Sequence, residues 1–415
     1  MPGNRSPDVS GLRSSNMKRK ILIVILGLIV FSQIPFAYRR YRLRGLRNTI
    51  QQLAAQRIAP TPENEYVDYK GVIHVHTFLG GHSTGAFTEL IAAAKANQLD
   101  FVIMTEHPQA EFDTSAMTLN GTHAGVLFIN GNEVASANGD RLLLIPGTSN
   151  AASMSIQSTQ QIVEQQKLNG GLAIAAYPSE SETWKSSGVD GVEVYNLFTN
   201  ARQIRPAVMF FDGLWSYRSY ADLMFANFFR RPDENLRRWD TAMLDAHRKL
   251  VATAGNDAHS NVGVSLNDAS GKQLIGLKLD PYERSFRTVR THVLIKKGIS
   301  LTRDSLLQAL SQGHCYISFD LFGEGTGFSF SAKNSDKIMG DEVGSTTNAE
   351  FMVRAPLAAR IVVIKNGNVV EQSHGTTAEF PATGPGVYRV EIYLDSLPAP
   401  ALGKPWIISN PIYLR

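Results

Sequence analysis

Two histidines separated by one residue follow an apolar run, in the stretch Gly71-Val72-Ile73-His74-Val75-His76-Thr77. β-Branched residues favour a strand, and a strand sends residues two apart to the same side, so His74 and His76 should project together. The glycines after them allow a turn that could bring His82 to the same place. Neutral imidazole is the commonest metal ligand among side chains, so this spacing predicts a zinc-like metal site. A polar stripe on a half-exposed strand is the alternative interpretation.

Side chains that bind metals also follow other strand-like runs. The runs and the residues after them are 101–104 with Glu106-His107, 126–129 with Glu133, and 250–254 with Asp257 and His259. In parallel α/β folds the carboxyl ends of the strands form the floor of the active site, so these side chains should gather there. Each of them alone is more often a turn residue, a helix cap or an ordinary histidine. Their joint occurrence at the same place relative to several strands predicts one site.

As a set, these motifs resemble those of the polymerase and histidinol phosphatase (PHP) superfamily of metal-dependent phosphoesterases. The matching segments are 74–77, His82, 105–107, 131–133, 191–196 and 256–259. The resemblance covers 66–320 and implies a distorted β/α barrel with up to three metals at the carboxyl ends of its strands. It implies one metal on His74, His76, Glu133 and Asp257 and another on His82, His107 and His259.

The chain departs from the family pattern at three positions. Glu106 stands where the family usually has Asp, Asp140 where a His is usual, and Tyr177 where the family has the His of an Ala-His-Pro motif. Asp140 and Tyr177 are thus possible positions for a third metal, but a neutral phenol with a pKa near 10 is a poor ligand. We therefore expect two tightly held divalent ions, of zinc, manganese or iron.

An apolar run near the amino terminus predicts a membrane anchor. Residues 21–38 would form about 27 Å of helix, close to the bilayer core of about 30 Å. No small-x-small cleavage site follows, so retention is favoured over a cleaved signal peptide. Lys18-Arg19-Lys20 ahead of the run favours a barrel outside the cytoplasm, although arginines also follow it. Because these residues contribute much of the net charge of +4, they give no specific sign of nucleic-acid binding.

The chain of 415 residues, 43% of them hydrophobic, should hold two or three packed domains. The expected divisions are a basic tail at 1–20, the anchor at 21–38, a juxtamembrane helix and linker at 39–65, a PHP-like barrel at 66–323 and an antiparallel β-sandwich at 324–415. Within the barrel, strands at 141–145, 172–176 and 191–195 alternate with helices at 86–97, 158–168, 234–249 and 302–312. Such alternation favours a mainly parallel sheet.

Two further local signals concern the elements around the site. Asn366-Gly367 lies between two β-rich runs and predicts a hairpin. Residues 207–231 are strongly aromatic and predict a buried helical insertion over the barrel. A lid or a surface resting on lipid headgroups is the alternative. The remaining histidines match no motif and should be structural, and the single Cys315 excludes an intrachain disulfide.

The predicted chemistry is hydrolysis of a phosphomonoester or phosphodiester, because clustered metals generate hydroxide at neutral pH and offset the charge of phosphoryl oxygens. The substrate would be a phosphorylated small molecule or an oligonucleotide, and no protein partner is identifiable. Arg202 and Arg205 could meet the phosphate, with a solvated helix face as the alternative for both. A different possibility is a PHP-like protein that has lost turnover and binds a metal, another ligand or a glycan at the membrane.

Overall fold

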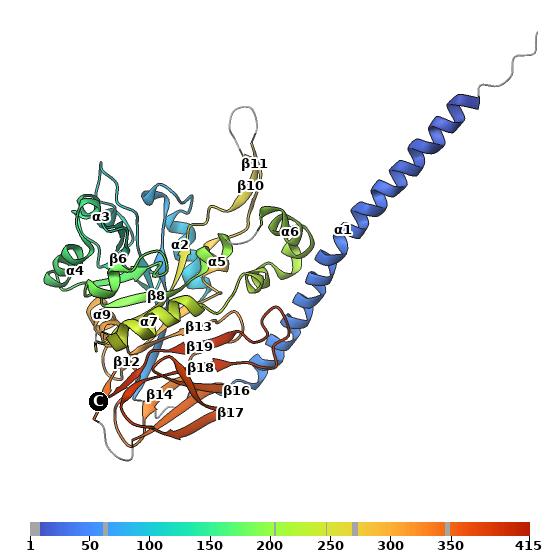
Figure 1. Cartoon of the computed structure of the whole chain (residues 1–415). Coiled ribbons are helices and arrows are strands. Elements are labelled where there is room, and N and C mark those ends of the chain that lie inside the picture. The colour runs from blue at the N-terminus through green and yellow to red at the C-terminus, as the bar shows by residue number, and fades with distance from the viewer. Residues whose placement is uncertain (1–8, 61–64, 203–204, 246, 268–272, 345–348) are drawn as a thin grey trace, which may run out of the picture.

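A long helix projects from a mixed α/β body (Figure 1). The computed structural model describes residues 9–60, 65–202, 205–245, 247–267, 273–344 and 349–415. The helix α1 (Val9–Gln56) is exposed from residue 17 to 32. Its part Met17–Gln56 is long and apolar enough to cross a membrane. The expected anchor and juxtamembrane helix form one continuous element.

The second half of α1 is part of the body. Leu43, Leu46 and Leu53 are buried in the main hydrophobic core. Just beyond the helix, the backbone N–H of Ile58 donates to the carbonyl of Pro356 at 2.8 Å. The orientation of α1 is therefore set by packing against the globular part.

The central sheet is mainly parallel and surrounds the histidine pair. Its strands pair in the order β4, β2, β1, β9, β8, β7, β6, β5, and a single bridge between Glu106 and Asn132 links β5 to the segment after β2. Only the β5–β6 and β6–β7 pairs are antiparallel in this series. The mixed α/β class predicted from the sequence is confirmed. The bounds are β1 (Tyr66–Val75), β2 (Phe101–Met104), β4 (Val126–Ile129), β5 (Asn132–Ala135), β6 (Arg141–Ile145), β7 (Leu172–Ala176), β8 (Gly191–Asn196) and β9 (Val251–Ala258).

Amphipathic helices cover this sheet close to where the apolar periodicity predicted them. Ser158 caps α4 in a reciprocal arrangement with Gln161, and Thr302 caps α9 in the same way with Ser305. The predicted helix at 234–249 ends earlier, at Asp245. The helices are α2 (Phe87–Ala96), α3 (Thr114–Met117), α4 (Thr159–Leu168), α5 (Leu197–Arg202), α6 (Pro206–Tyr220), α7 (Asp233–Asp245), α8 (Tyr282–Ser285) and α9 (Arg303–Gln312).

The carboxyl-terminal strands are mostly antiparallel and continue the central sheet. β12 pairs with β1, β13 with β12, and β19 with β13, so hydrogen bonds connect this region to the strand that bears His74. Asn366 and Gly367 both have positive φ, at 51° and 80°, as the predicted hairpin requires. The bounds are β12 (Arg290–Lys296), β13 (Cys315–Ser318), β14 (Ser329–Ala332), β15 (Glu342–Val343), β16 (Glu350–Lys365), β17 (Asn368–Pro381), β18 (Gly386–Tyr393), β19 (Pro405–Ser409) and β20 (Ile412–Leu414).

Two small elements complete the chain. The short strand β3 (Gly121–His123) pairs with β4. β10 (Gly263–Asn267) and β11 (Gln273–Lys278) form a separate hairpin that projects from the body (Figure 1).

The aromatic segment is helical, as predicted, but only partly buried. Phe225, Phe228 and Phe229 are buried in the main core, whereas Phe210 and Leu214 of α6 are exposed. The prediction of a buried insertion therefore holds for the second half of the segment and not for the outer face of α6.

Candidate metal centre

The end of β1 brings two imidazoles together through an irregular backbone. His74 has φ of 68°, and the register of β1 against both β2 and β9 shifts between Ile73 and Val75. Both side chains are fully buried, with ring centroids 5.0 Å apart. The predicted convergence of His74 and His76 is present, although a bulge rather than simple strand alternation produces it.

Four donor atoms from three strands are spaced as ligands of one ion. The Nε2 atom of His74 lies 3.3 Å from Glu133 Oε2 and 3.5 Å from Asp257 Oδ1. The Nε2 atom of His76 lies 3.4 Å and 3.3 Å from the same two oxygens. Tetrahedral coordination with bonds of about 2.0–2.2 Å places ligand atoms about 3.3–3.6 Å apart. The spacing of these side chains thus fits a divalent metal.

Some buried polar atoms of this cluster have no hydrogen-bond partner among the described residues. Both ring nitrogens of His76 and the Oδ1 atom of Asp257 are buried and lack a hydrogen-bond partner among the described residues. Buried polar groups are nearly always hydrogen-bonded in folded proteins, so several unpaired ones together need an explanation. A bound cation would satisfy His76 Nε2 and Asp257 Oδ1 at once.

The protonation states of His76, His107 and Glu133 suit metal binding. Burial lowers the pKa of His76 to about 4 and that of His107 to about 3, so both imidazoles are neutral at pH 7. Burial would raise the pKa of Glu133, but the imidazoles of His74, His76 and His107 outweigh it and lower this pKa to about 2. His76 and His107 are therefore neutral and Glu133 is ionised, which are the ligating forms. Burial would lower the pKa of His74, but the carboxylates of Glu193, Asp257 and Glu133 outweigh it and raise this pKa well above its usual value, so His74 must release a proton when it binds a metal.

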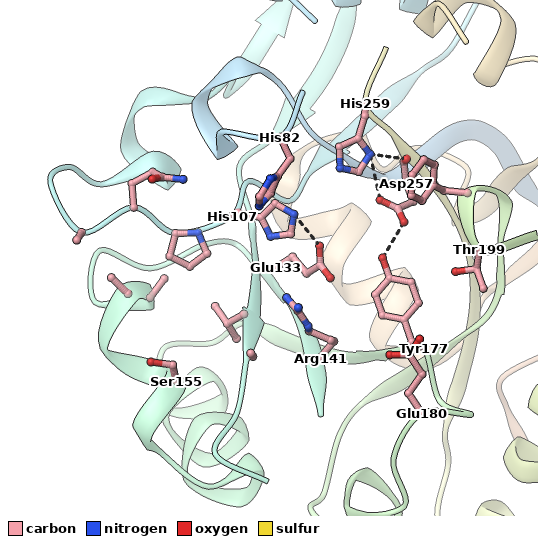
Figure 2. A pocket seen from close by; sticks show the side chains of 18 of the residues that line it. His82, His107, Glu133, Arg141, Ser155, Tyr177, Glu180, Thr199, Asp257 and His259 are labelled. Carbon is pink, nitrogen blue, oxygen red and sulfur yellow. Dashed lines mark hydrogen bonds and ion pairs between the residues drawn. The ribbon is translucent and has the colours of Figure 1, made fainter. Parts of the chain in front are cut away.

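A second compact group overlaps the first. Suitable atoms of His76, His107 and His259 lie within 4.8 Å of one another, as do those of His74, His76 and Glu133. His82 is exposed, and its ring centroid lies 5.0 Å from that of His107. Figure 2 shows His82, His107 and His259 around the same space as Glu133 and Asp257. His76 stands nearer to His107 and His259 than the predicted grouping implied, and His82 lies at the outer side.

Glu193 contacts the cluster, although the sequence patterns predict no role for it. Its Oε2 atom lies 2.6 Å from His74 Nδ1, and its Oε1 atom accepts a hydrogen bond from Asn196 Nδ2 at 2.7 Å. The signal available was an acidic residue inside the apolar strand Gly191-Val192-Glu193-Val194, all of which is buried. A carboxylate in this position orients a ligating imidazole.

Tyr177 faces the cluster as a hydrogen-bond donor. Its hydroxyl donates to Asp257 Oδ2 at 2.7 Å (Figure 2), and its φ is 48°. Burial, together with the Asp257 and Glu133 carboxylates, raises the pKa of this phenol, so it stays neutral. Because Tyr177 bonds to Oδ2, the Oδ1 atom of Asp257 stays available to bind a metal.

Asp140 and Glu106 face other partners. Asp140 Oδ2 accepts a hydrogen bond from Thr159 Oγ1 at 2.5 Å, at the start of α4. Glu106 accepts hydrogen bonds from the backbone and hydroxyl of Thr77, at 2.9 and 2.6 Å, and from Thr118 Oγ1 at 2.9 Å. The Glu106 carboxylate thus supports the turn behind His76.

The cluster opens into a cavity of about 870 Å³, within the usual size of small-ligand sites. Arg141 and Arg202 line this cavity together with His82, His107 and His259. Arg205 is exposed next to the start of α6 and is not among the described residues that line it. Of the two arginines predicted to meet phosphate, Arg202 is placed to do so, and Arg141 is an additional candidate.

No protein-family model and no curated protein matches the chain. Its structural neighbours include PHP-like proteins. A two-domain protein from Bacteroides vulgatus that contains a predicted PHP-like metal-dependent phosphoesterase has 13% identity and a TM-score of 0.38, over 86% of this chain and 98% of that one. PsfC from Pseudomonas syringae has 14% identity and a TM-score of 0.39, over 61% and 91%. A candidate metal-dependent phosphoesterase from Bifidobacterium adolescentis has 14% identity and a TM-score of 0.30, over 55% and 96%.

Two of these three neighbours, those from Bacteroides vulgatus and Bifidobacterium adolescentis, are described as metal-dependent phosphoesterases.

Proposed function

We propose that the protein is a metal-dependent phosphoesterase whose ions are held in a distorted β/α barrel. The observation that supports this most strongly is the set of four buried donor atoms in which each of two imidazole nitrogens lies 3.3–3.5 Å from each of two carboxylate oxygens. His74, His76, Glu133 and Asp257 would hold one ion. His82, His107 and His259 would hold a second, with His76 close enough to contribute. Zinc, manganese and iron all suit such mixed imidazole and carboxylate sites.

When bound, divalent ions at such a site acidify water and offset the negative charge of phosphoryl oxygens. The chain supplies orientation. Glu193 accepts a hydrogen bond from His74 Nδ1, which leaves Nε2 directed at the cluster. Tyr177 and Asn196 donate to Asp257 Oδ2, at 2.7 and 3.3 Å, which leaves Oδ1 available. Each of these contacts fixes a ligand in the form that binds a cation.

The cationic lining of the cavity supports an anionic substrate. The guanidinium groups of Arg141 and Arg202 border the same space as the cluster, and guanidinium binds phosphate oxygens in a bidentate way. A nucleophilic side chain is not required, because metal-bound water provides the attacking oxygen in this class of reaction. Cys315 is buried and bonded in the sheet, where burial raises its thiol pKa.

The exposed apolar half of α1 supports a further part of the proposal, that the enzyme is anchored in a membrane as a single-pass protein. Its catalytic part would lie outside the cytoplasm.

The test is a metal-dependent assay on the full chain. Protein stripped of metal by a chelator should release phosphate or 4-nitrophenol from model phosphoesters only after Mn²⁺ or Zn²⁺ is restored. His76→Ala should abolish this activity, whereas His374→Ala, at an exposed position, should not. Tight metal binding without any turnover would favour a protein that keeps the site and has lost the reaction.

A further inference from the structure

A second cavity adjoins the metal centre and has the opposite chemical character. It has a volume of about 210 Å³ and lies between α5, α6 and the short helical turn Asp222–Asn227. Its lining is largely aliphatic and aromatic and includes Leu197, Ala201, Met209, Met224, Phe225 and Phe228. No cofactor or catalytic role assigned above uses this space.

The two cavities share their border. Phe198, Arg202 and Asp257 line both of them. The centroid of the Phe198 ring lies 5.3 Å from that of the His259 ring. The Arg202 guanidinium lies over the Phe198 ring, 5.9 Å from its centroid. A molecule with its phosphate among the metal ligands could therefore extend an apolar group past Phe198 into the second cavity. Arg202 would then stand where the charged and apolar parts of the molecule join.

The helix that forms one wall of this cavity is attached to the apolar helix α1. Arg39 of α1 makes a bidentate ion pair with Asp212 of α6, at 2.8 and 2.6 Å. Trp215 Nε1 donates to Gln33 Oε1 at 3.0 Å, and the Phe36 and Phe211 rings are 5.1 Å apart. These contacts begin where the exposed apolar stretch of α1 ends, so α6 lies at the level of a membrane surface if α1 spans the bilayer.

The outer face of α6 suits that position. Phe210 is 59% exposed and Leu214 is 70% exposed, and the exposed cations Arg205 and Arg218 flank them. Exposed apolar groups bordered by arginines are typical of helices that rest in the headgroup region. Met209 and Tyr217 of the same helix line the apolar cavity.

We propose that the substrate is an amphiphilic phosphoester, whose phosphate lies at the metal centre and whose alkyl chain occupies the cavity beneath α5 and α6. This inference rests on the proposed function and names its substrate class. In the reaction, water forms a new P–O bond and the ester P–O bond breaks. Water thus supplies the hydroxyl on phosphorus and the proton on the departing alcohol.

The test compares octyl phosphate with methyl phosphate, below the critical micelle concentration of the octyl ester. The metal-loaded full chain, kept soluble by an amphipathic polymer, is assayed for release of inorganic phosphate. Each buried methylene contributes about fourfold in affinity, so the octyl ester should be preferred by about tenfold or more in kcat/KM. Equal kcat/KM for the two esters would overturn the inference and leave the proposed function intact.

Cavity-filling variants link any preference to this cavity. Ala201→Phe and Met209→Trp should each reduce the octyl preference to less than about threefold, because the added rings occupy the space that the chain needs. The matched control is Ala207→Phe, on the exposed side of α6, which should keep the full preference. An undiminished preference in both cavity variants would place the alkyl chain elsewhere.

Calorimetry separates this inference from the proposed function. If neither ester is hydrolysed, the proposed function fails, and binding of octyl phosphate and of inorganic phosphate to the metal-loaded protein is measured instead. Binding of the octyl ester that is about tenfold tighter, and that is lost in Ala201→Phe, would still support an amphiphile site. Equal affinities would overturn it.

Discussion

At the candidate metal centre, residues adopt backbone conformations that their side chains disfavour. His74, Tyr177 and Asp257 have φ of 68°, 48° and 47°. A left-handed conformation costs an ordinary residue about 1 kcal/mol or more, and such residues cluster at functional sites. Here each one turns a side chain into the cluster. The strain is offset by the surrounding sheet, whose pairing continues on both sides of β1.

Glu193 is expected to control metal affinity without contacting the metal. Glu193→Gln keeps the size of the side chain but removes the charge that holds His74 Nδ1. Loss of such a partner typically lowers metal affinity about 10–100-fold. A competitive chelator titration measures this effect.

Glu106→Gln is the matched control, because Glu106 is also buried but is bonded to Thr77 and Thr118. It should leave the affinity within about threefold of the unmodified protein, since its hydrogen bonds are to Thr77 and Thr118 and to no ligating side chain. Equal losses in both variants would show that buried negative charge in general, rather than orientation of His74, sets the affinity.

Sequence motifs identified most of the residues that meet at the cluster. His74, His76, Glu133 and Asp257 were predicted as one set, and the structure brings their donor atoms together. The supporting role of Glu193 was not predictable, because it depends on a contact between β1 and β8 across 119 positions of sequence. The same reason applies to Asp140, whose partner Thr159 belongs to a later helix.

At the scale of elements, a buried charge cluster joins β1, β12 and the turn after β13. His292 Nδ1 lies 2.9 Å from Asp68 Oδ1, and His292 Nε2 lies 3.4 Å from Asp320 Oδ2. Burial alone would lower the pKa of His292, but the two carboxylates outweigh it and raise the pKa to about 9. This histidine had been assigned a structural role from its lack of a motif, and its contacts agree with that role.

Stability should therefore depend on pH through His292. Because the folded pKa is above the unfolded value of about 6.5, the contribution is fully present below about pH 6.5 and is lost as pH rises through about 9. The contribution of His292 to the free energy of unfolding is about 3 kcal/mol at most. Denaturant unfolding at pH 6 and pH 9.5 measures this effect. The free energy of unfolding should fall between the two pH values in the unmodified protein, and it should fall less in His292→Gln.

His374→Gln serves as the control for this pH series, because that side chain is 71% exposed. Its unfolding should follow the unmodified protein at both pH values. If His292→Gln shows the same pH dependence as the unmodified protein, other groups are responsible for it.

The periodicity of the sequence located the elements better than their ends. Strand β2 and strand β7 have the predicted bounds, whereas β9 extends to Ala258 and includes Asp257 within the strand. Gly255 and the polar residues Asn256 and Asp257 suggested that the strand had ended. Pairing of Gly255 with β1 and β8 and of Ala258 with β1 keeps this segment in the sheet, and the tertiary contact overrides the local preference.

At the scale of the whole molecule, the carboxyl-terminal strands support the sheet that holds the metal centre. Asn410 Oδ1 accepts a hydrogen bond from the backbone N–H of Ala252 at 2.8 Å, and its Nδ2 donates to the carbonyls of Ala252 and Cys315 at 3.0 and 2.9 Å. These buried bonds join the segment after β19 to β9 and β13. The boundary predicted at residue 324 therefore separates regions that share backbone hydrogen bonds and one core.

Asn410→Ala should destabilise the fold by about 3 kcal/mol or more, because it leaves three buried backbone groups unpaired. Asn368→Ala, at an exposed hairpin position, should change stability by less than about 0.5 kcal/mol. Denaturant unfolding monitored by tryptophan fluorescence gives both values. Similar stability of the two variants would mean that the carboxyl-terminal strands fold independently of β9.

The membrane arrangement is tested on intact cells. If α1 is an anchor and the body lies outside the cytoplasm, protease added to spheroplasts should digest the body while a cytoplasmic control protein survives. Digestion only after lysis would reverse the proposed orientation. Recovery of the body in the soluble fraction, shortened at its amino terminus, would instead indicate a cleaved signal peptide.

The central claim is that this cluster of imidazoles and carboxylates holds divalent ions, and elemental analysis after exhaustive dialysis tests it most directly. We predict two tightly bound ions per chain in the unmodified protein. Asp257→Ala should lose at least one of them, because it removes a donor atom of the four-atom set, yet it should keep the same secondary structure by circular dichroism. A dialysed protein without metal, or an Asp257→Ala variant with the full metal content, would contradict the account.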